Sequence, residues 1–308
     1  MLTRAIVLCL VLLPAAAAAQ LYTDAELESA RRQIGPVTEM LTRDIPATLP
    51  RAQRAAAAAI RPEFPDRVDS HPLNMFAIPA SATVVIPLET LRFLDDYAIL
   101  LAWDNLRGCE SGYIDTYLYA LLREGRRLPP PLRAFGLDRD AALADPGIDD
   151  LSMKILKSQV FFLLAHEIGH ILLDHDPTAT GAASRAQELE ADAFALEAFA
   201  AIGTAPSGMA TWFYATRYLD PTGAEVEYTT HPVFSARLAA FADRLAADPA
   251  AFSHSEPDFE AAQQRVAAVV DELRRLADLG DDDDMLDLLP QALLSEFPVS
   301  GLVTACSR

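Results

Sequence analysis

The 308-residue chain has few cysteines, few strand-like runs and little positive charge. Its 25 Lys and Arg residues are outnumbered by 44 Asp and Glu residues, which gives a formal net charge of −19. A negative surface argues against nucleic acid and anionic lipid as partners, because both are polyanions. Ala-rich segments with few β-branched runs predict a mainly helical fold, and the length suffices for one large domain or two small ones.

Of the three cysteines, one lies in the apolar segment at the N-terminus. Residues 1–19 combine Arg4, a short apolar run and a small-residue cleavage site at Ala17-Ala18-Ala19, which is typical of a secretory signal peptide. The alternative is an uncleaved membrane anchor, although the run is shorter than the roughly 20 residues that a span needs. Export predicts a periplasmic or secreted protein, in which a disulfide between Cys109 and Cys306 is permitted but not required.

Beyond the N-terminal segment, no run has the pattern of a membrane-spanning helix. The apolar stretch 160–173 is interrupted by two histidines and a glutamate, so it is predicted to be buried in protein. We therefore expect no stable membrane span in the mature chain.

Apolar periodicity and chain-breaking residues predict most of the secondary structure. Helices are expected over 22–43, 51–60, 88–106, 114–124, from Asp149 or Asp150 to about His175, and over 184–202, 207–219, 232–247, 258–279 and 285–295. The one predicted strand is 82–87, which is rich in β-branched residues. The expected fold class is mainly α (α+β), with a small β-sheet.

The central motif is His166-Glu167-x-x-His170. Residues i and i+4 share a helix face, so the two imidazoles can bind one zinc ion, with the Glu167 carboxylate within reach of a water there. Apolar residues flank the motif at 161–164 and 171–173, and polar side chains on such a dry helix need partners. The alternative is a chance match on a structural helix.

A catalytic zinc ion needs a third protein ligand and one open position. Glu188 lies on the next predicted helix, which reaches the same metal if the two helices pack antiparallel. Asp192 shares the helix face of Glu188 at i+4, whereas Glu190 does not. We predict Glu188 as the ligand and Asp192 as the carboxylate that orients a ligating histidine. The alternative is that all three are exposed helix acids.

These motifs resemble the zinc peptidase family of the CaaX prenyl protease and the bacterial heat-shock protease HtpX. The family has a His-Glu-x-x-His helix followed by Glu-x-x-x-Asp, with Ala before the Asp, as at 188–192 here. The segment 74–79 resembles the family's sequence before its edge strand, which implies that Asn74, Phe76 and Ala77 bind an extended substrate.

Downstream, Thr230-His231-Pro232 and Arg237 resemble the family's His-Pro motif. The resemblance implies that His231 stabilises the developing oxyanion and that Arg237 braces the site or Glu188. A helix N-terminal histidine and a surface arginine are the alternatives.

The chain departs from the family in two places. Ala80-Ser81 replaces a Gly pair, and a longer connection, residues 104–149, precedes the zinc helix; it is expected to be a lid or a substrate-selecting insertion. His175 lacks the glycine context of a third histidine ligand and is predicted to cap the helix C-terminus. His71 and His254 are expected to be solvated.

The resemblance implies a zincin-type metallopeptidase domain over 20–247, followed by a helical extension over 248–308. It would bind one Zn²⁺ per chain and hydrolyse peptide bonds in envelope or misfolded proteins, with Glu167 as the base. Two alternatives stay open. One is a periplasmic quality-control or binding factor with a latent zinc site capped by His231; the other is a zinc hydrolase with a non-peptide substrate.

Overall fold

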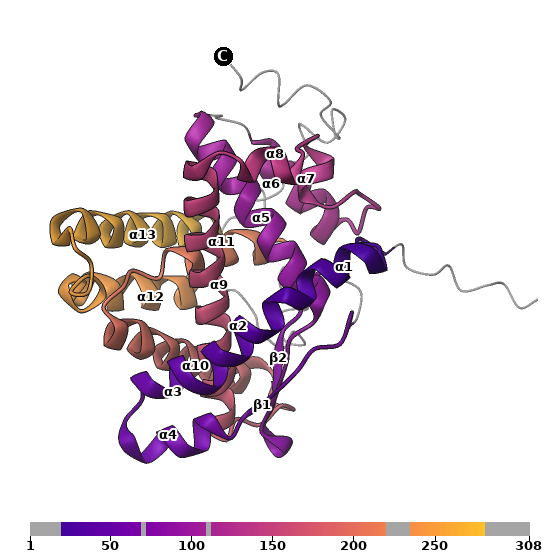
Figure 1. Cartoon of the computed structure of the whole chain (residues 1–308). Helices are drawn as coiled ribbons and strands as arrows, with labels where there is room; N and C mark the ends of the chain where they lie inside the picture. The colour runs from indigo at the N-terminus through magenta and orange to yellow at the C-terminus, as the bar shows by residue number, and fades with distance from the viewer. Residues whose placement is uncertain (1–19, 69–71, 109–111, 220–234, 281–308) are drawn as a thin grey trace, which may run out of the picture.

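The computed structural model describes residues 20–68, 72–108, 112–219 and 235–280, and it is mainly helical with one small sheet (Figure 1). This confirms the predicted fold class. The signal-peptide segment 1–19, Cys109, Cys306, His71, His231 and the predicted helix 285–295 lie outside the described residues.

The N-terminal segment forms one winding helical run and then a short separate helix. Its elements are α1 (Asp24–Ala30), η1 (Arg31–Gln33), α2 (Ile34–Glu39), η2 (Met40–Asp44), α3 (Ile45–Thr48) and α4 (Arg51–Ala58). Thr23 begins the run with a capping box, in which its side chain and that of Glu26 each accept a hydrogen bond from the other's backbone N–H. The predicted helices over 22–43 and 51–60 are therefore confirmed in outline.

The sheet has three short strands in the order β1-β3-β2: β1 (Arg61–Glu63), β2 (Phe76–Ile78) and β3 (Thr83–Val85). β3 pairs in parallel with β1 and antiparallel with β2, where Phe76 lies opposite Val85. The predicted strand 82–87 thus exists as β3, but it is the central strand and not the edge strand. The edge strand next to the zinc-motif helix is β2, which the sequence patterns did not predict.

After the sheet, α5 (Leu88–Arg107) begins the larger helical part of the fold. The insertion follows as α6 (Tyr113–Leu118), η4 (Tyr119–Arg123), α7 (Pro131–Ala134) and α8 (Arg139–Leu143). α7 and α8 pack against α5, and α8 also packs against the start of the next helix. Figure 1 shows these short helices together at one end of the molecule.

The central helix is α9 (Pro146–Leu172), which packs against α5, α10 and α11. It begins earlier than predicted, because Asp145 and neither Asp149 nor Asp150 is its cap: the Asp145 carboxylate accepts from Gly147 N–H at 2.9 Å. Pro146 at the first helical position is preset for a helix start. Every residue from 159 to 170 is buried, so this helix has no solvent face around the zinc motif.

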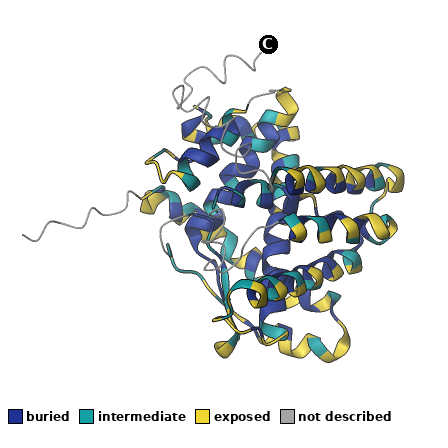
Figure 2. Ribbon diagram, turned by 180° about the vertical axis from the view of Figure 1, so that it is seen from behind, coloured by how far each residue is buried: buried dark blue, intermediate teal, exposed yellow. Residues whose placement is uncertain are grey.

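By length and composition α9 is able to cross a membrane, but 72% of its most apolar window is buried inside the fold. Figure 2 shows where buried and exposed residues lie in the described part of the chain: buried residues are in the interior, and exposed residues are on the outer faces of the helices.

Of the remaining helices, α10 and α11 pack against α9, and the others pack against these two or against one another. They are α10 (Gly181–Ile202), α11 (Ser207–Thr216), α12 (Ser235–Ala247), η6 (Pro249–Phe252) and α13 (Phe259–Gly280). Gly203 ends α10 in the left-handed conformation, with φ 69°. The described part of the C-terminal extension, η6 and α13, packs against α10, α11 and α12.

Candidate metal centre and cleft

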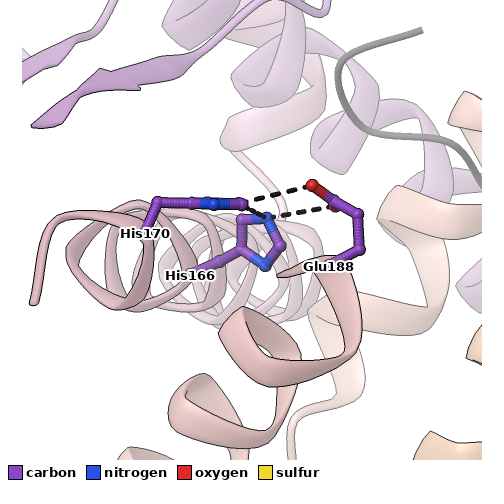
Figure 3. Close-up of side chains that lie close together, drawn as sticks. All are labelled: His166, His170 and Glu188. Carbon is purple, nitrogen blue, oxygen red and sulfur yellow. Dashed lines mark hydrogen bonds and ion pairs between the residues drawn. The ribbon is translucent and has the colours of Figure 1, made fainter. Parts of the chain in front are cut away.

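Three donor atoms from two helices meet at one point (Figure 3). His166 Nε2 and His170 Nε2 are 3.0 Å apart; the first lies 3.4 Å from Glu188 Oε2 and the second 3.4 Å from Glu188 Oε1. The histidines lie on α9 and Glu188 on α10, and all three residues are buried. The predicted antiparallel arrangement of the two helices brings these side chains together.

This donor set fits a zinc ion. Bonds of about 2.1 Å at tetrahedral angles place two ligand atoms about 3.4 Å apart, and one ligand atom from each of the three residues here lies within 4.8 Å of the others. Two imidazole nitrogens and one carboxylate oxygen are also the donor types that catalytic zinc takes, with one position open. We therefore describe the cluster as a candidate site for one divalent metal ion.

The backbones of α9 and α10 approach closely at Gly169, between the two histidines. A Cβ atom added at Gly169 would lie 3.2 Å from Ala191 Cα and 3.2 Å from Phe194 Cβ. Ala191 lies between Glu188 and Asp192 on α10, so the missing side chain at Gly169 lets both carboxylates reach α9.

A buried ion network holds His166. Its Nδ1 lies 2.8 Å from Asp192 Oδ1, and Arg237 Nη2 donates to the same oxygen at 2.8 Å. Arg237 Nη1 lies 3.0 Å from Glu188 Oε2, so one guanidinium of α12 contacts both carboxylates. Arg237 is only 3% exposed and is not a surface arginine. Asp192 thus contacts a histidine of the cluster, and Arg237 contacts Glu188, as was expected from their positions in the sequence.

The same network changes the acid–base behaviour of His166. Burial lowers the pKa of the imidazole, but the charge of Glu188 and the hydrogen bonds to Asp192 and Glu188 outweigh it and raise the pKa to about 10. A metal ion that binds to Nε2 must displace that proton, so metal uptake by this site is coupled to proton release.

A second, different set of contacts holds His170. Its Nδ1 lies 2.8 Å from Nδ1 of His175, and Nε2 of His175 lies 3.1 Å from Glu190 Oε2. The prediction that His175 caps the helix C-terminus with its side chain is wrong. The chain turns after α9, with Asp174 at φ 54°, and this turn directs the His175 ring to the side of His170. Sequence reasoning also gave Glu190 no role.

A cleft of about 590 Å³ opens over the cluster. One wall is the strand-containing segment 74 and 76–80, which includes the predicted substrate-binding residues Asn74, Phe76 and Ala77. The other wall is the loop between α9 and α10, and Glu167, His170 and Glu188 lie in the lining between them. Glu167 is 2% exposed, so its carboxylate faces the cleft from a dry position.

The described part of the insertion, 104–108 and 112–149, does not line this cleft. Of the insertion helices, α7 and α8 pack against α5, and α8 also packs against the N-terminal end of α9, which follows it in the chain. At about 1.5 Å per residue, that end is about 30 Å along the helix from His166. The expectation of a lid therefore finds no support in the described part of the insertion.

The side chain of His254, which was expected to be solvated, is exposed.

Comparison with known proteins returned one family. Residues 140–255, which hold both zinc-motif histidines, Glu188, Asp192 and Arg237, match the model of a peptidase family, which indicates a hydrolase that cleaves peptide bonds. That family is described as Peptidase U49. The match spans less than half of the chain, and no curated protein and no solved structure matched. The resemblance to the family of HtpX and the CaaX prenyl protease stays a prediction.

Proposed function

We propose that this protein is a zinc-dependent metalloendopeptidase that cleaves envelope or misfolded proteins after its own export. The observation that carries the proposal is the meeting of two histidine nitrogens and one carboxylate within reach of a single metal ion, beside Glu167, in a cleft large enough for a peptide. The peptidase family match over the same residues supports it independently.

In this proposal His166, His170 and Glu188 hold one Zn²⁺. Bound there, the ion would act as a Lewis acid that polarises the scissile carbonyl and favours loss of a proton from the attacking water. The remaining steps are performed by side chains of the chain itself.

Glu167 is the proposed general base and acid. Its carboxylate is adjacent to the ligand His166 in sequence and lines the cleft with His170. It takes the proton from the attacking water and later delivers it to the leaving amine. Because the carboxylate is buried, bulk water competes little for these proton transfers.

The edge strand β2 is the proposed substrate-binding strand. It lies at the edge of the sheet, contacts α9, and forms one wall of the cleft. An extended peptide can pair with such an edge through main-chain hydrogen bonds, with Phe76 and Ala77 next to its side chains. Asn74, just before the strand, also lines the cleft and would contact the same peptide.

Two further roles rest on the sequence resemblance. His231 is proposed to donate a hydrogen bond to the developing oxyanion. Arg237 is proposed to hold Glu188 and Asp192 in place, which its contacts with both carboxylates support. The peptidase match does not favour the alternative of a binding factor with a latent site.

The test measures zinc content and casein cleavage for the wild type and for Glu167→Gln. We expect about one zinc per chain in both proteins, and cleavage by the wild type that a chelator abolishes. The variant should lose about 100- to 10,000-fold in kcat, the usual contribution of general acid–base catalysis. A protein that binds no zinc, or a Glu167→Gln variant with full activity, would refute the proposal.

A further inference from the structure

We infer that His175 and Glu190 form a positioning relay for His170, through which a carboxylate at the protein surface sets the metal affinity of the buried site. The inference rests on the proposed function in one respect, because it takes His170 as a metal ligand. It assigns a role to two residues that neither the zinc motif nor the ion network of Arg237 involves.

The first step is the position of the proton on His170. Its Nε2 faces His166 and Glu188, so a metal ion would bind at this nitrogen. A neutral imidazole that binds a metal through Nε2 carries its proton on Nδ1 and needs an acceptor there. The atom at that place is Nδ1 of His175, at 2.8 Å.

The second step fixes the tautomer of His175. To accept at Nδ1, this ring must carry its own proton on Nε2. That proton points to Glu190 Oε2, at 3.1 Å. In the other tautomer two N–H groups would face each other, and the His170 ring would have to turn away from the metal position. Glu190 therefore favours the one tautomer of His175 that is compatible with metal binding by His170.

The third step concerns how the His175 ring is held. Its backbone N–H donates to the carbonyl oxygen of His170 at 3.0 Å, so the residue continues directly from the end of α9. The two imidazole rings are 4.8 Å apart at an angle of 76°, and His175 is 6% exposed. Because the His175 ring is buried and its backbone is bonded to His170, the ring has little freedom to turn. Its orientation can therefore fix the orientation of the His170 ring.

The last step is the exposure of Glu190. Its side chain is 64% exposed, whereas the Glu188 side chain two residues earlier is 1% exposed. The relay thus leads from the metal position to solvent within two hydrogen bonds. A change at the Glu190 carboxylate can therefore alter the hydrogen bond that orients the metal ligand His170.

The experiment measures the zinc dissociation constant by competition with a chromogenic chelator for His175→Leu, Glu190→Ala and Glu190→Gln. The matched control is Glu197→Ala, since Glu197 lies on the same helix, is 66% exposed and pairs with Arg244 instead. We expect His175→Leu to weaken zinc binding by about 10- to 100-fold, the usual effect of losing such a partner. Glu190→Ala should weaken it by about 2- to 12-fold, the weight of one hydrogen bond.

Glu190→Gln keeps an acceptor for the His175 N–H and should restore affinity towards the wild type, whereas Glu197→Ala should bind as the wild type does. In Co²⁺-loaded protein, His175→Leu should also shift the visible absorption bands, because the His170 ring turns. Far-UV circular dichroism of the metal-free proteins checks folding, and the exposed Glu190 variants decide the matter if His175→Leu fails to fold.

Wild-type zinc affinity in Glu190→Ala would overturn the relay and leave the peptidase proposal standing. A wild-type protein that binds no zinc would overturn both.

Discussion

The two histidines of the candidate metal centre are one helical turn apart, yet they are held in different ways. Asp192 and Arg237 hold His166 from inside the protein, where all three side chains are nearly inaccessible. His175 and Glu190 hold His170 from the side of the α9–α10 loop, and the Glu190 side chain is mostly exposed. The first arrangement is buried throughout, whereas the second is buried at His175 and reaches the surface at Glu190.

The difference separates two contributions of residues around a metal. Buried charges that neutralise one another must all be present for the fold to tolerate any of them. A hydrogen bond that ends in solvent can be replaced by water at small cost to folding. We therefore expect changes around His166 to affect both stability and metal binding, and changes around His170 to affect mainly metal binding.

The largest effect should follow from Arg237→Met. The change leaves the buried Glu188 and Asp192 without the guanidinium that contacts both, and only the His166 imidazole still lies beside them, which should lower the free energy of unfolding by about 3–5 kcal/mol. Urea unfolding of the metal-free protein measures it. Arg244→Met is the control on the same helix, because Arg244 pairs with the exposed Glu197 and should cost under about 1 kcal/mol. Equal losses in the two variants would contradict the contrast between core and surface.

Removing the metal should have a smaller effect. Because Arg237 and the protonated His166 already compensate the buried carboxylates, we expect the metal-free protein to be folded. Zinc at about 100 times its dissociation constant should then add about 2.7 kcal/mol to the free energy of unfolding. Thermal unfolding with zinc and with a chelator tests this. A metal-free protein without cooperative unfolding would show that the ion network does not support the fold alone.

The sequence predicts the parts of this site that depend on the spacing of residues along a helix. His166, His170, Glu188 and Asp192 were correctly grouped, because helical periodicity places i and i+4 on one face whatever the surroundings. The helix packing needed only a short connection between α9 and α10. These parts of the site depend on local geometry that a sequence carries directly.

The remainder depends on geometry that the sequence does not carry. His175 reaches His170 only because Asp174 turns the chain with a positive φ, and no residue pattern marks that turn. β1 and β2 have three residues each, too few for an alternating pattern, and β1 contains Pro62. The order β1-β3-β2, and with it the identity of the edge strand, is a property of pairing between distant segments.

Gly169 connects the two arrangements, since it lies between His166 and His170 where α9 touches α10. In Gly169→Ala the new methyl group pushes against Ala191 and Phe194, and the cost of this crowding, about 1–3 kcal/mol, offsets the gain in helix propensity. The displacement of α10 should also move Glu188 from the histidines and weaken zinc binding. Chelator competition and urea unfolding measure the two effects.

The control for Gly169→Ala is Gly35→Ala in α2, where an added Cβ meets nothing within 4 Å. This change should stabilise the protein by up to about 1 kcal/mol without altering zinc binding. If Gly169→Ala gains as much stability and binds zinc as well as the wild type does, the close approach of α9 and α10 does not position the ligands.

The smallest effect comes from a carboxylate that has no such compensation. Burial raises the pKa of Asp104 in α5 to about 6, and its Oδ1 has no hydrogen-bond partner among the described residues. The folded state thus holds the Asp104 proton more tightly than the unfolded state does. The penalty for ionising it is absent below pH 4 and complete above about pH 6, so this group lowers stability as the pH rises.

Asp104→Asn removes that penalty and should raise the free energy of unfolding at pH 8 by about 1 kcal/mol, after allowance for solvent around a half-buried side chain. The gain should shrink as the pH falls from 6 to 4, which urea unfolding at several pH values measures. The exposed Asp243→Asn should stay within about 0.5 kcal/mol of the wild type throughout. A gain for Asp104→Asn that does not depend on pH would contradict this explanation. It would mean that packing around residue 104, and not the lack of a neighbouring cation, makes Asp104 unfavourable while Asp192 is tolerated.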